Sequence, residues 1–408
     1  MMTMGKMTIQ QSKSKARSAS DLGSVLADGN PWGVFGNGID AAPTPRFNLV
    51  SLFSGCGGFD LGFHFAGFRT VWANDINEDA AATFRKNLGE ITVGDITQTP
   101  LPTLRVKVDA LVAGFPCQPF SNAGSRLGVS DTRGTLFQDA LRAVEHFAPK
   151  VVVFENVRGL LSFKTAQTPL VQAICDQLSA HGYRASFKLV DASDNRVGQR
   201  RLRLLIVGVA DSLQTEFAFP RTRSKEGLNI GEMLKGLKAT TLNQKERMVL
   251  NPQAAALGVH VPEGGSWKDI PDSELPPRLI KVRANIERYR WPNFYRRFHR
   301  DEIAGTVTAA FKPENAAVWH PITGKVLTVR EIARIQSFPD WFDFQGKSIK
   351  SKYQQIGNAV PPRLAYELAL SVKHALAGAS VPEAEPLSFK KFLSLGRPYR
   401  PADPAVTF

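Results

Sequence analysis

Cysteine is scarce in this 408-residue chain, and the hallmarks of several protein classes are missing. Its three cysteines, Cys56, Cys117 and Cys175, follow no regular spacing, which argues against a disulfide framework and a zinc site and suits a reducing compartment. No apolar run approaches the roughly 20 residues of a membrane span, and residues 1–42 lack the apolar segment of a signal peptide. We therefore expect a cytoplasmic protein that uses no membrane and no metal.

Positive charge is abundant and unevenly distributed. The chain carries 51 Lys and Arg against 37 Asp and Glu, a net charge of +14. Between residues 215 and 300 the counts are 16 and 9, so 86 residues carry +7, half of the total. A concentrated basic excess is typical of a protein that binds a polyanion. A solvated basic face with no partner remains an alternative.

Apolar strand-like runs alternate with helical patterns in the first half of the chain. Such alternation predicts an α/β fold with a doubly wound, mostly parallel, Rossmann-like sheet. The strands are expected at 47–53, 70–74, 109–114, 151–155, 187–190 and 204–209, and the helices at 77–87, 136–147 and 169–181. Helical patterns return at 328–337 and 361–377.

The chain divides by composition into four parts. We expect flexible tails at 1–46 and 379–408, a main domain at 47–210 that is completed by about 340–378, and a smaller domain at 211–339, which is rich in Pro, Gly and charge.

Three polar sites follow successive strands and together predict a bound adenosine. A glycine-rich turn at 55–58 follows the first strand, and glycines there let the backbone approach a ligand closely. Alone, this turn is compatible with NAD, FAD or S-adenosylmethionine. Asp75 lies 75 − 55 = 20 residues after Gly55, where an acid grips ribose hydroxyls in nucleotide-binding folds. Asp95 could accept a hydrogen bond from an adenine amino group, although an isolated acid of this kind is more often a loop cap.

Cys117 follows the apolar run 109–114, and Pro116 fixes the backbone before it. An isolated free cysteine is usually a small buried hydrophobe. Glu155, however, ends the next strand and should emerge at the same rim of the sheet. A thiol nucleophile beside a carboxyl group and a methyl donor suits nucleophilic activation of a heterocycle.

Eight runs, in order, resemble the DNA (cytosine-5)-methyltransferase family of restriction–modification type. The runs are 53–58 (FSGCGG), 74–75 (ND), 94–96 (GDI), 114–121 (GFPCQPFS), 154–157 (FENV), 199–203 (QRRLR), 330–339 (REIARIQSFP) and 355–360 (QIGNAV). They cover residues 47 to about 365. The resemblance implies methyl transfer from S-adenosylmethionine to C5 of a flipped cytosine in a specific double-stranded DNA sequence. Cys117 would add to C6, and Glu155 would hydrogen-bond the ring.

The resemblance also implies roles for other residues. Arg201 and Arg203 would support the base and Glu155, Phe53 would stack near the adenine, and Asn358 would tie the last helix to the catalytic rim. The residues expected to bind the cofactor are Phe53, Ser54, Gly55, Cys56, Gly57, Gly58, Asp75, Ile76, Asp95, Ile96, Pro116, Asn358 and Ala359. Those expected to bind DNA are Gln118, Ser121, Arg126, Arg133, Arg288, Arg290, Arg296 and Arg297.

Residues 211–339 would be the family's variable target-recognition domain, here called the recognition region, and residues 121–135 a loop that closes over DNA. We expect a monomer; a cognate restriction endonuclease would act separately. In residues 278–300, eight basic residues alternate with aromatic ones, which suits phosphate contacts and base stacking. Alternatively, the aromatic residues form the core of the smaller domain.

Two positions depart from the family pattern. Residues 195–198 (NRVG) replace the usual aromatic-Gly-x-Pro turn, and Ile76 stands where some members carry an aromatic residue. Three rival functions are a tRNA cytosine-5 methyltransferase, a non-catalytic DNA-binding module and a nicotinamide dehydrogenase. The spacing of the glycines disfavours the dehydrogenase, and the complete set of Cys117, Glu155 and Arg203 disfavours the inactive module.

Overall fold

Short apolar runs build a central sheet in the computed structural model, which describes residues 38–116, 135–165, 168–223, 225–285, 295–314 and 316–378. Across the sheet the order is β3 (Thr92–Val93), β2 (Phe68–Asp75), β1 (Phe47–Leu52), β4 (Ala110–Ala113), β5 (Val151–Val157), β9 (Leu202–Ala210) and β8 (Tyr183–Asp191). The strands from β3 to β5 pair in parallel, whereas β9 runs antiparallel to both β5 and β8. The predicted α/β class and the mostly parallel sheet are confirmed.

Both faces of the sheet are covered, because successive side chains of a strand point to opposite sides. In β4, Ala110 and Val112 belong to one apolar cluster, and Leu111 and Ala113 belong to another. The first cluster includes side chains of α2 (Gly58–Phe65) and α11 (Pro362–Leu376), and the second those of α4 (Thr135–Phe147) and α5 (Leu170–Ala180). The remaining helix of this half, α3 (Glu78–Asn87), packs against β2 through a small cluster around Phe84.

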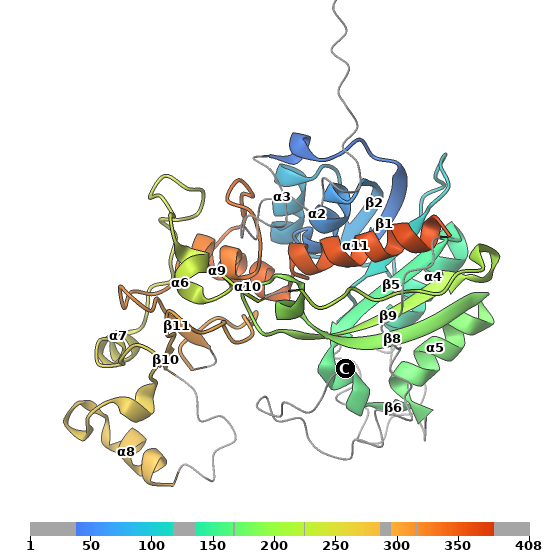
Figure 1. Cartoon of the computed structure of the whole chain (residues 1–408). Helices are drawn as coiled ribbons and strands as arrows, with labels where there is room; N and C mark the ends of the chain where they lie inside the picture. Colours follow the sequence, from blue (N-terminus) through green and yellow to red (C-terminus); the bar gives the residue numbers. More distant parts are fainter. Residues whose placement is uncertain are drawn as a thin grey trace, which may run out of the picture.

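The C-terminal helix α11 returns to the beginning of the fold and packs closely on α2 (Figure 1). A Cβ atom added to Gly62 of α2 would lie 2.5 Å from the carbonyl oxygen of Pro362 and from the backbone nitrogen of Tyr366. Glycine at this position therefore allows two backbones to approach closely. The contact explains how the end of the chain covers a sheet that its first half forms.

The recognition region contributes short elements that lie to one side of the sheet (Figure 1). They are α6 (Ile230–Leu234), α7 (Pro252–Gly258), α8 (Pro277–Ala284), the paired strands β10 (Arg296–Arg297) and β11 (Ala317–Trp319), and α9 (Val329–Ile335), after which comes α10 (Ile349–Asn358). A two-stranded hairpin, β6 (Lys164–Thr165) with β7 (Thr168–Pro169), precedes α5. Trp267 is fully buried, and Tyr295 and Phe298 are 7% and 4% exposed. These aromatic residues form core, as the second alternative predicted; Tyr289, Trp291 and Phe294 lie outside the described residues.

The predicted strands and long helices agree with the observed ones to within four residues at each end. The short helices α6, α7 and α8 were not predicted, since their patterns are only five to eight residues long. In the part of the chain that the structure describes, no helix is long and apolar enough to cross a membrane. The same residues contain no cluster of three or more His, Cys, Asp and Glu side chains that could hold a metal ion.

A buried carboxylate joins α2 to the first two strands. Asp60 is 1% exposed and accepts hydrogen bonds from the hydroxyl groups of Ser51 on β1 (2.9 Å) and Thr70 on β2 (2.8 Å). Burial raises the pKa of Asp60 to about 6, although both hydroxyl groups lower it. The charged form of Asp60 is therefore less favourable in the folded protein than in the unfolded chain.

We predict that Asp60→Asn changes how stability depends on pH. Because the folded-state pKa of about 6 exceeds the ordinary value of 3.8, the native state binds more protons between these values, and the Asp60 contribution to stability falls as pH rises through this window. The variant lacks this loss, so its free energy of unfolding relative to the wild type should rise by about 2–3 kcal/mol between pH 4 and pH 7. Urea unfolding at several pH values measures the difference.

The exposed carboxylate of Glu90 provides the control, because Glu90→Gln alters a charge in water. Its free energy of unfolding should follow that of the wild type across the same pH range. A stability difference for Asp60→Asn that is independent of pH would contradict the assignment.

Candidate active site

The loop after β1 is held in a left-handed backbone conformation at three positions. Phe53, Gly55 and Gly57 have φ angles of 52°, 55° and 93°, a region that costs a residue with a side chain about 1–2 kcal/mol. The backbone N–H of Gly55 donates to Oδ2 of Asp75 at 2.7 Å. The first two polar sites predicted from the sequence are therefore in direct contact.

The third site is joined to the second through Asn74, the buried residue before Asp75. Its Nδ2 donates to the carbonyl oxygen of Gly94 at 3.0 Å, while Ser54 N–H donates to the carbonyl oxygen of Asn74 at 3.1 Å. The loops that follow β1, β2 and β3 thus meet at one edge of the sheet. The sequence prediction that these three junctions converge is confirmed.

The convergent edge combines acidic and apolar groups. Oδ1 of Asp75 accepts from the N–H of Asn77 at 2.8 Å, and burial raises the pKa of Asp75 above its ordinary value. Asp95 is exposed and caps its own turn by accepting from the N–H of Thr97 at 3.0 Å, while Ile96 is buried. Ile76 is 68% exposed, unusually high for an apolar side chain that follows a buried strand.

Two glycines of this loop and its cysteine differ in what surrounds them. A Cβ atom on Gly55 would meet nothing within 4 Å, so its backbone faces open space, whereas one on Gly58 would collide with the carbonyl oxygen of Val360. Cys56 is 1% exposed, and its Sγ lies 3.8 Å from the carbonyl oxygen of Gln355. The side chain of Cys56 therefore packs toward α10, so only its backbone can line a ligand site at this edge.

Glu155 and Arg203 form a buried ion pair on neighbouring strands. Glu155 lies opposite Leu205, and Arg203 lies opposite Val157, so the two charged residues are diagonal neighbours on the same face of an antiparallel pair. Nε of Arg203 is 2.6 Å from Oε1 of Glu155, with side-chain exposures of 12% and 11%. The predicted contact between these residues is confirmed.

The chain leaves β4 beside this ion pair. A Cβ atom on Gly114 would lie 3.6 Å from Oε2 of Glu155, and Nδ2 of Asn156 donates to the carbonyl oxygen of Phe115 at 3.0 Å. Pro116, the next residue, is exposed. Residues 114 and 115, which lead into Cys117, are therefore held against Glu155 and Asn156. The predicted residues Cys117, Gln118, Ser121, Arg126 and Arg133 lie outside the described residues.

Arg201 does not pair with Glu155 as predicted. It precedes β9, beyond the end of β5, and is 1% exposed. Its guanidinium donates to three backbone carbonyl oxygens, those of Val307 (2.8 Å), Gly357 (2.8 Å) and Ala359 (3.2 Å). The two arginines of one motif thus have different partners, and among the described residues it is Arg203 that pairs with the carboxylate.

Asn358 also differs from its prediction. Its side chain is exposed and has no hydrogen-bond partner among the described residues, whereas the carbonyl groups of Gly357 and Ala359 on either side bind Arg201. Ala359 O also accepts from Nε2 of Gln336 at 2.7 Å. The backbone around Asn358, and not its side chain, ties the end of α10 to the catalytic rim.

Two arginines predicted to bind DNA have internal partners. The guanidinium of Arg296 forms two hydrogen bonds with Glu302, at 2.8 and 2.6 Å. That of Arg297 donates to the carbonyl oxygens of Val261, Pro321 and Ile322. Both guanidinium groups therefore stabilise the recognition region, and their contact with DNA stays a prediction. Arg288 and Arg290 lie outside the described residues.

The unusual turn at residues 195–198 keeps a left-handed position without glycine. A short 3-10 helix, Ala192–Asn195, ends at Arg196, whose φ is 63°. Gly198 packs against Met233 of α6 so closely that a Cβ atom would lie 2.7 Å from its side chain. Residues 195–198 therefore lead into residues 199–203 through a left-handed turn that packs on α6.

The chain resembles known proteins over most of its length. The model of the C-5 cytosine-specific DNA methylase family matches residues 47–374. The type II methyltransferase M.Eco47II of Escherichia coli is 36% identical over 349 residues, which cover 81% of this chain and 79% of that protein. The type II methyltransferase M.NgoFVII of Neisseria gonorrhoeae is 37% identical over 336 residues, 79% and 86% of the two chains.

Solved structures share the fold at lower identity. The Dnmt2 methyltransferase of S. pombe superposes with a TM-score of 0.57 at 18% identity and covers 80% of this chain and 99% of its own. EhMeth of Entamoeba histolytica gives a TM-score of 0.54 at 17% identity, with coverage of 82% and 99%.

We predict that alanine substitutions at the two left-handed glycines differ in their effect on stability. Gly55→Ala should lower the free energy of unfolding by about 1–2 kcal/mol, the cost of the backbone conformation alone. Gly57→Ala should cost about 1–3 kcal/mol more, because the new Cβ atom would collide with Leu88 and crowd Phe84. Chemical unfolding measures both, and equal losses would contradict the packing described for this loop.

Proposed function

Because the chain belongs to the C-5 cytosine-specific DNA methylase family, of restriction–modification type, we propose that it transfers a methyl group from S-adenosylmethionine to C5 of a cytosine in double-stranded DNA. The observation that carries the proposal is the buried ion pair of Glu155 and Arg203 beside Gly114, three residues before Cys117. A carboxylate held in this way can accept or share hydrogen bonds with a heterocycle in a site that excludes water.

The edge where the three loops meet fits S-adenosylmethionine. The open space at Gly55 leaves room for a ligand against the backbone, and Asp75 offers acceptor oxygens for ribose hydroxyls. The exposed side chain of Ile76 supplies an apolar surface for an adenine ring, and the exposed carboxylate of Asp95 an acceptor for its amino group. When bound, the cofactor would supply an electrophilic methyl group. Phe53, Ser54 and the backbone of residues 55–58 would line the same site, with Ile96, Pro116 and Ala359 as further candidates.

The chemistry on cytosine requires a nucleophile and a group that stabilises negative charge. The thiolate of Cys117 would add to C6, and the electron pair of the C5–C6 double bond would make C5 nucleophilic. Glu155 would hydrogen-bond the N3–N4 edge of the ring, with Arg203 fixing its orientation. After methyl transfer, loss of the C5 proton and elimination of Cys117 would restore the double bond.

The substrate base must leave the duplex to reach such a site. Glu155 is 9% exposed, and side chains at this depth cannot touch a base that remains stacked. Extrusion costs a few kcal/mol, which contacts between phosphates and a protein of net charge +14 can offset. The recognition region would read the surrounding sequence.

We predict that Ile76→Ser weakens the binding of S-adenosylmethionine about 10-fold without changing thermal stability. The side chain is mostly in water in the free protein, so its loss affects the fold little, while the apolar area that adenine would cover is worth about 1–2 kcal/mol. Calorimetric titration without DNA measures the affinity. Val249→Ser, at a 95% exposed valine of the recognition region, is the matched control, and equal affinities in the two variants would contradict this placement of the cofactor.

We predict that the protein forms a covalent complex with DNA that contains 5-fluorocytosine. Release of Cys117 requires removal of the proton at C5, and a fluorine atom at that position cannot be removed by a base. Cys117→Ser should abolish both the complex and methyl transfer, as the hydroxyl group is a much weaker nucleophile. Denaturing electrophoresis detects the complex.

Cys175→Ala is the matched control, since this thiol is buried on α5, where burial raises its pKa to about 12. It should trap DNA as the wild type does. Methyl transfer by Cys117→Ser at the wild-type rate would refute the mechanism, and transfer to tRNA in place of DNA would favour the RNA alternative.

A further inference from the structure

Residues 198–201, just before β9, form one of the contacts between the recognition region and the central sheet. Gln199 forms an isolated parallel bridge with Ala304, and the N–H of Arg200 donates to the carbonyl oxygen of Ala304 at 2.8 Å. The hydroxyl group of Thr306 donates to the carbonyl oxygen of Arg200 at 2.8 Å. Residues 304–307 therefore run alongside the start of the strand that carries Arg203.

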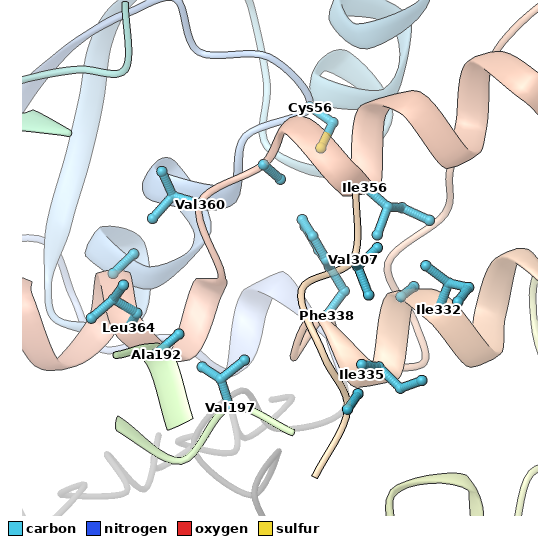
Figure 2. Close-up of a cluster of buried hydrophobic side chains, with 14 of the residues drawn as sticks. Cys56, Ala192, Val197, Val307, Ile332, Ile335, Phe338, Ile356, Val360 and Leu364 are labelled. Carbon is cyan, nitrogen blue, oxygen red and sulfur yellow. The ribbon is translucent and has the colours of Figure 1, made fainter. Parts of the chain in front are cut away.

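Both backbone polar groups of Val307 are bound by side chains of this stretch. Its N–H donates to Oε1 of Gln199 at 3.0 Å, and its carbonyl oxygen accepts from Nη1 of Arg201 at 2.8 Å. The side chain of Val307 is 4% exposed and packs in the apolar cluster with Ile332, Phe338 and Ile356 (Figure 2). Val307 is therefore bound to residues 199 and 201 through its backbone and to the apolar cluster through its side chain.

Arg201 extends this junction to the C-terminal part of the chain. Its other terminal nitrogen donates to Gly357 and Ala359, and Ala359 is also bound by Gln336, whose side chain contacts Gln199. One guanidinium thus binds two segments that lie 106 and at least 156 residues away from it in sequence. Gly357 itself approaches residues 308 and 309 so closely that a Cβ atom would overlap their backbone.

The environment of Arg201 is costly for a charged group, which argues that it does more than stabilise the fold. None of the hydrogen bonds that its guanidinium makes to described residues reaches a carboxylate, and its Nε has no partner among them; only its backbone N–H donates to a carboxylate, that of Asp191 at 3.0 Å. Burial lowers the pKa of Arg201, nearby Arg203 lowers it further, and Glu155 raises it. Burying a charge costs free energy unless its polar groups are paired, and here three backbone carbonyl groups are the observed partners.

We infer that Arg201 is a positioning residue that couples the seating of the recognition region to the alignment of Glu155 and Arg203. It lies two positions before Arg203 in the chain, about 7 Å away along extended backbone. A shift of Val307 when DNA is read correctly would thus reach the ion pair through Arg201. The inference rests on the proposed function, since it assigns DNA reading to the recognition region.

The test measures how well the Arg201→Lys variant discriminates between DNA sequences. Lysine keeps the charge but cannot bind three carbonyl groups in a planar fork. Cognate DNA is the sequence that the wild type methylates. On this DNA, kcat should fall at least 10-fold, because misplacement by 1 Å can cost about 100-fold in rate. The Kd for the same DNA should change less than 2-fold. The ratio of kcat/KM between cognate DNA and DNA with one base pair changed should fall at least 5-fold.

This ratio separates positioning from a structural role, because a smaller fraction of folded enzyme lowers both rates equally and leaves the ratio unchanged. Arg184→Lys is the control: the exposed guanidinium of Arg184, on the edge strand β8, also joins the sheet to the recognition region, through the carbonyl oxygens of Asp211 and Thr215 and the carboxylate of Asp211, but it contacts neither Val307 nor the ion pair. Its ratio should equal that of the wild type. An unchanged ratio in Arg201→Lys would overturn the inference.

Hydrogen exchange without DNA provides a readout that does not depend on activity. The amides of residues 304–309 should exchange at least 10-fold faster in Arg201→Lys than in the wild type. The same increase is expected in Gln199→Ala, which removes the other side-chain partner of Val307. Gln199→Ala also serves as the test variant if Arg201→Lys does not fold. Unchanged exchange in both variants would overturn the inference even if the wild type methylates DNA. Faster exchange in a protein that methylates no DNA would instead refute the proposed function and leave the mechanical link in place.

Discussion

The antiparallel pairing of β9 with β5 is the constraint on which the site depends. Its register places Arg203 diagonally across from Glu155, on the same face of the sheet. A shift of one residue would turn Arg203 to the opposite face, and Glu155 would remain as a buried carboxylate without a cation. Such a group costs several kcal/mol or takes up a proton. The pairing of β9 with β5 therefore determines which charge lies beside Glu155.

The same edge of the sheet brings the cofactor site and the ion pair together because β1, β2, β3, β4 and β5 are parallel and adjacent. Polar groups lie in the loops that follow these strands, and the loops contact each other through hydrogen bonds such as that from the Gly55 N–H to the Asp75 carboxylate. The C-terminal helix stabilises this arrangement by packing on α2. A chain end more than 300 residues away thus supports the glycine loop, which explains why the motifs are spread along the whole sequence.

Much of this could be predicted from the sequence, because strands, glycine turns and acids at strand ends are local patterns. The role of each arginine could not be predicted. Arg201 and Arg203 lie in one motif. Arg203 lies opposite β5 and pairs with Glu155, whereas Arg201 lies beyond the end of β5 and binds three carbonyl groups. In the same way, the charges of Arg296 and Arg297 suggested DNA, but their partners Glu302 and Pro321 are set by tertiary packing. Val307 carried no local signal at all.

The most direct test of the account is nucleoside analysis by mass spectrometry of DNA that has been incubated with the protein and S-adenosylmethionine. The account predicts 5-methylcytosine, confined to one position of a recurring duplex sequence. Methyl groups on N4 of cytosine or N6 of adenine, or no methylated base in DNA, would contradict it.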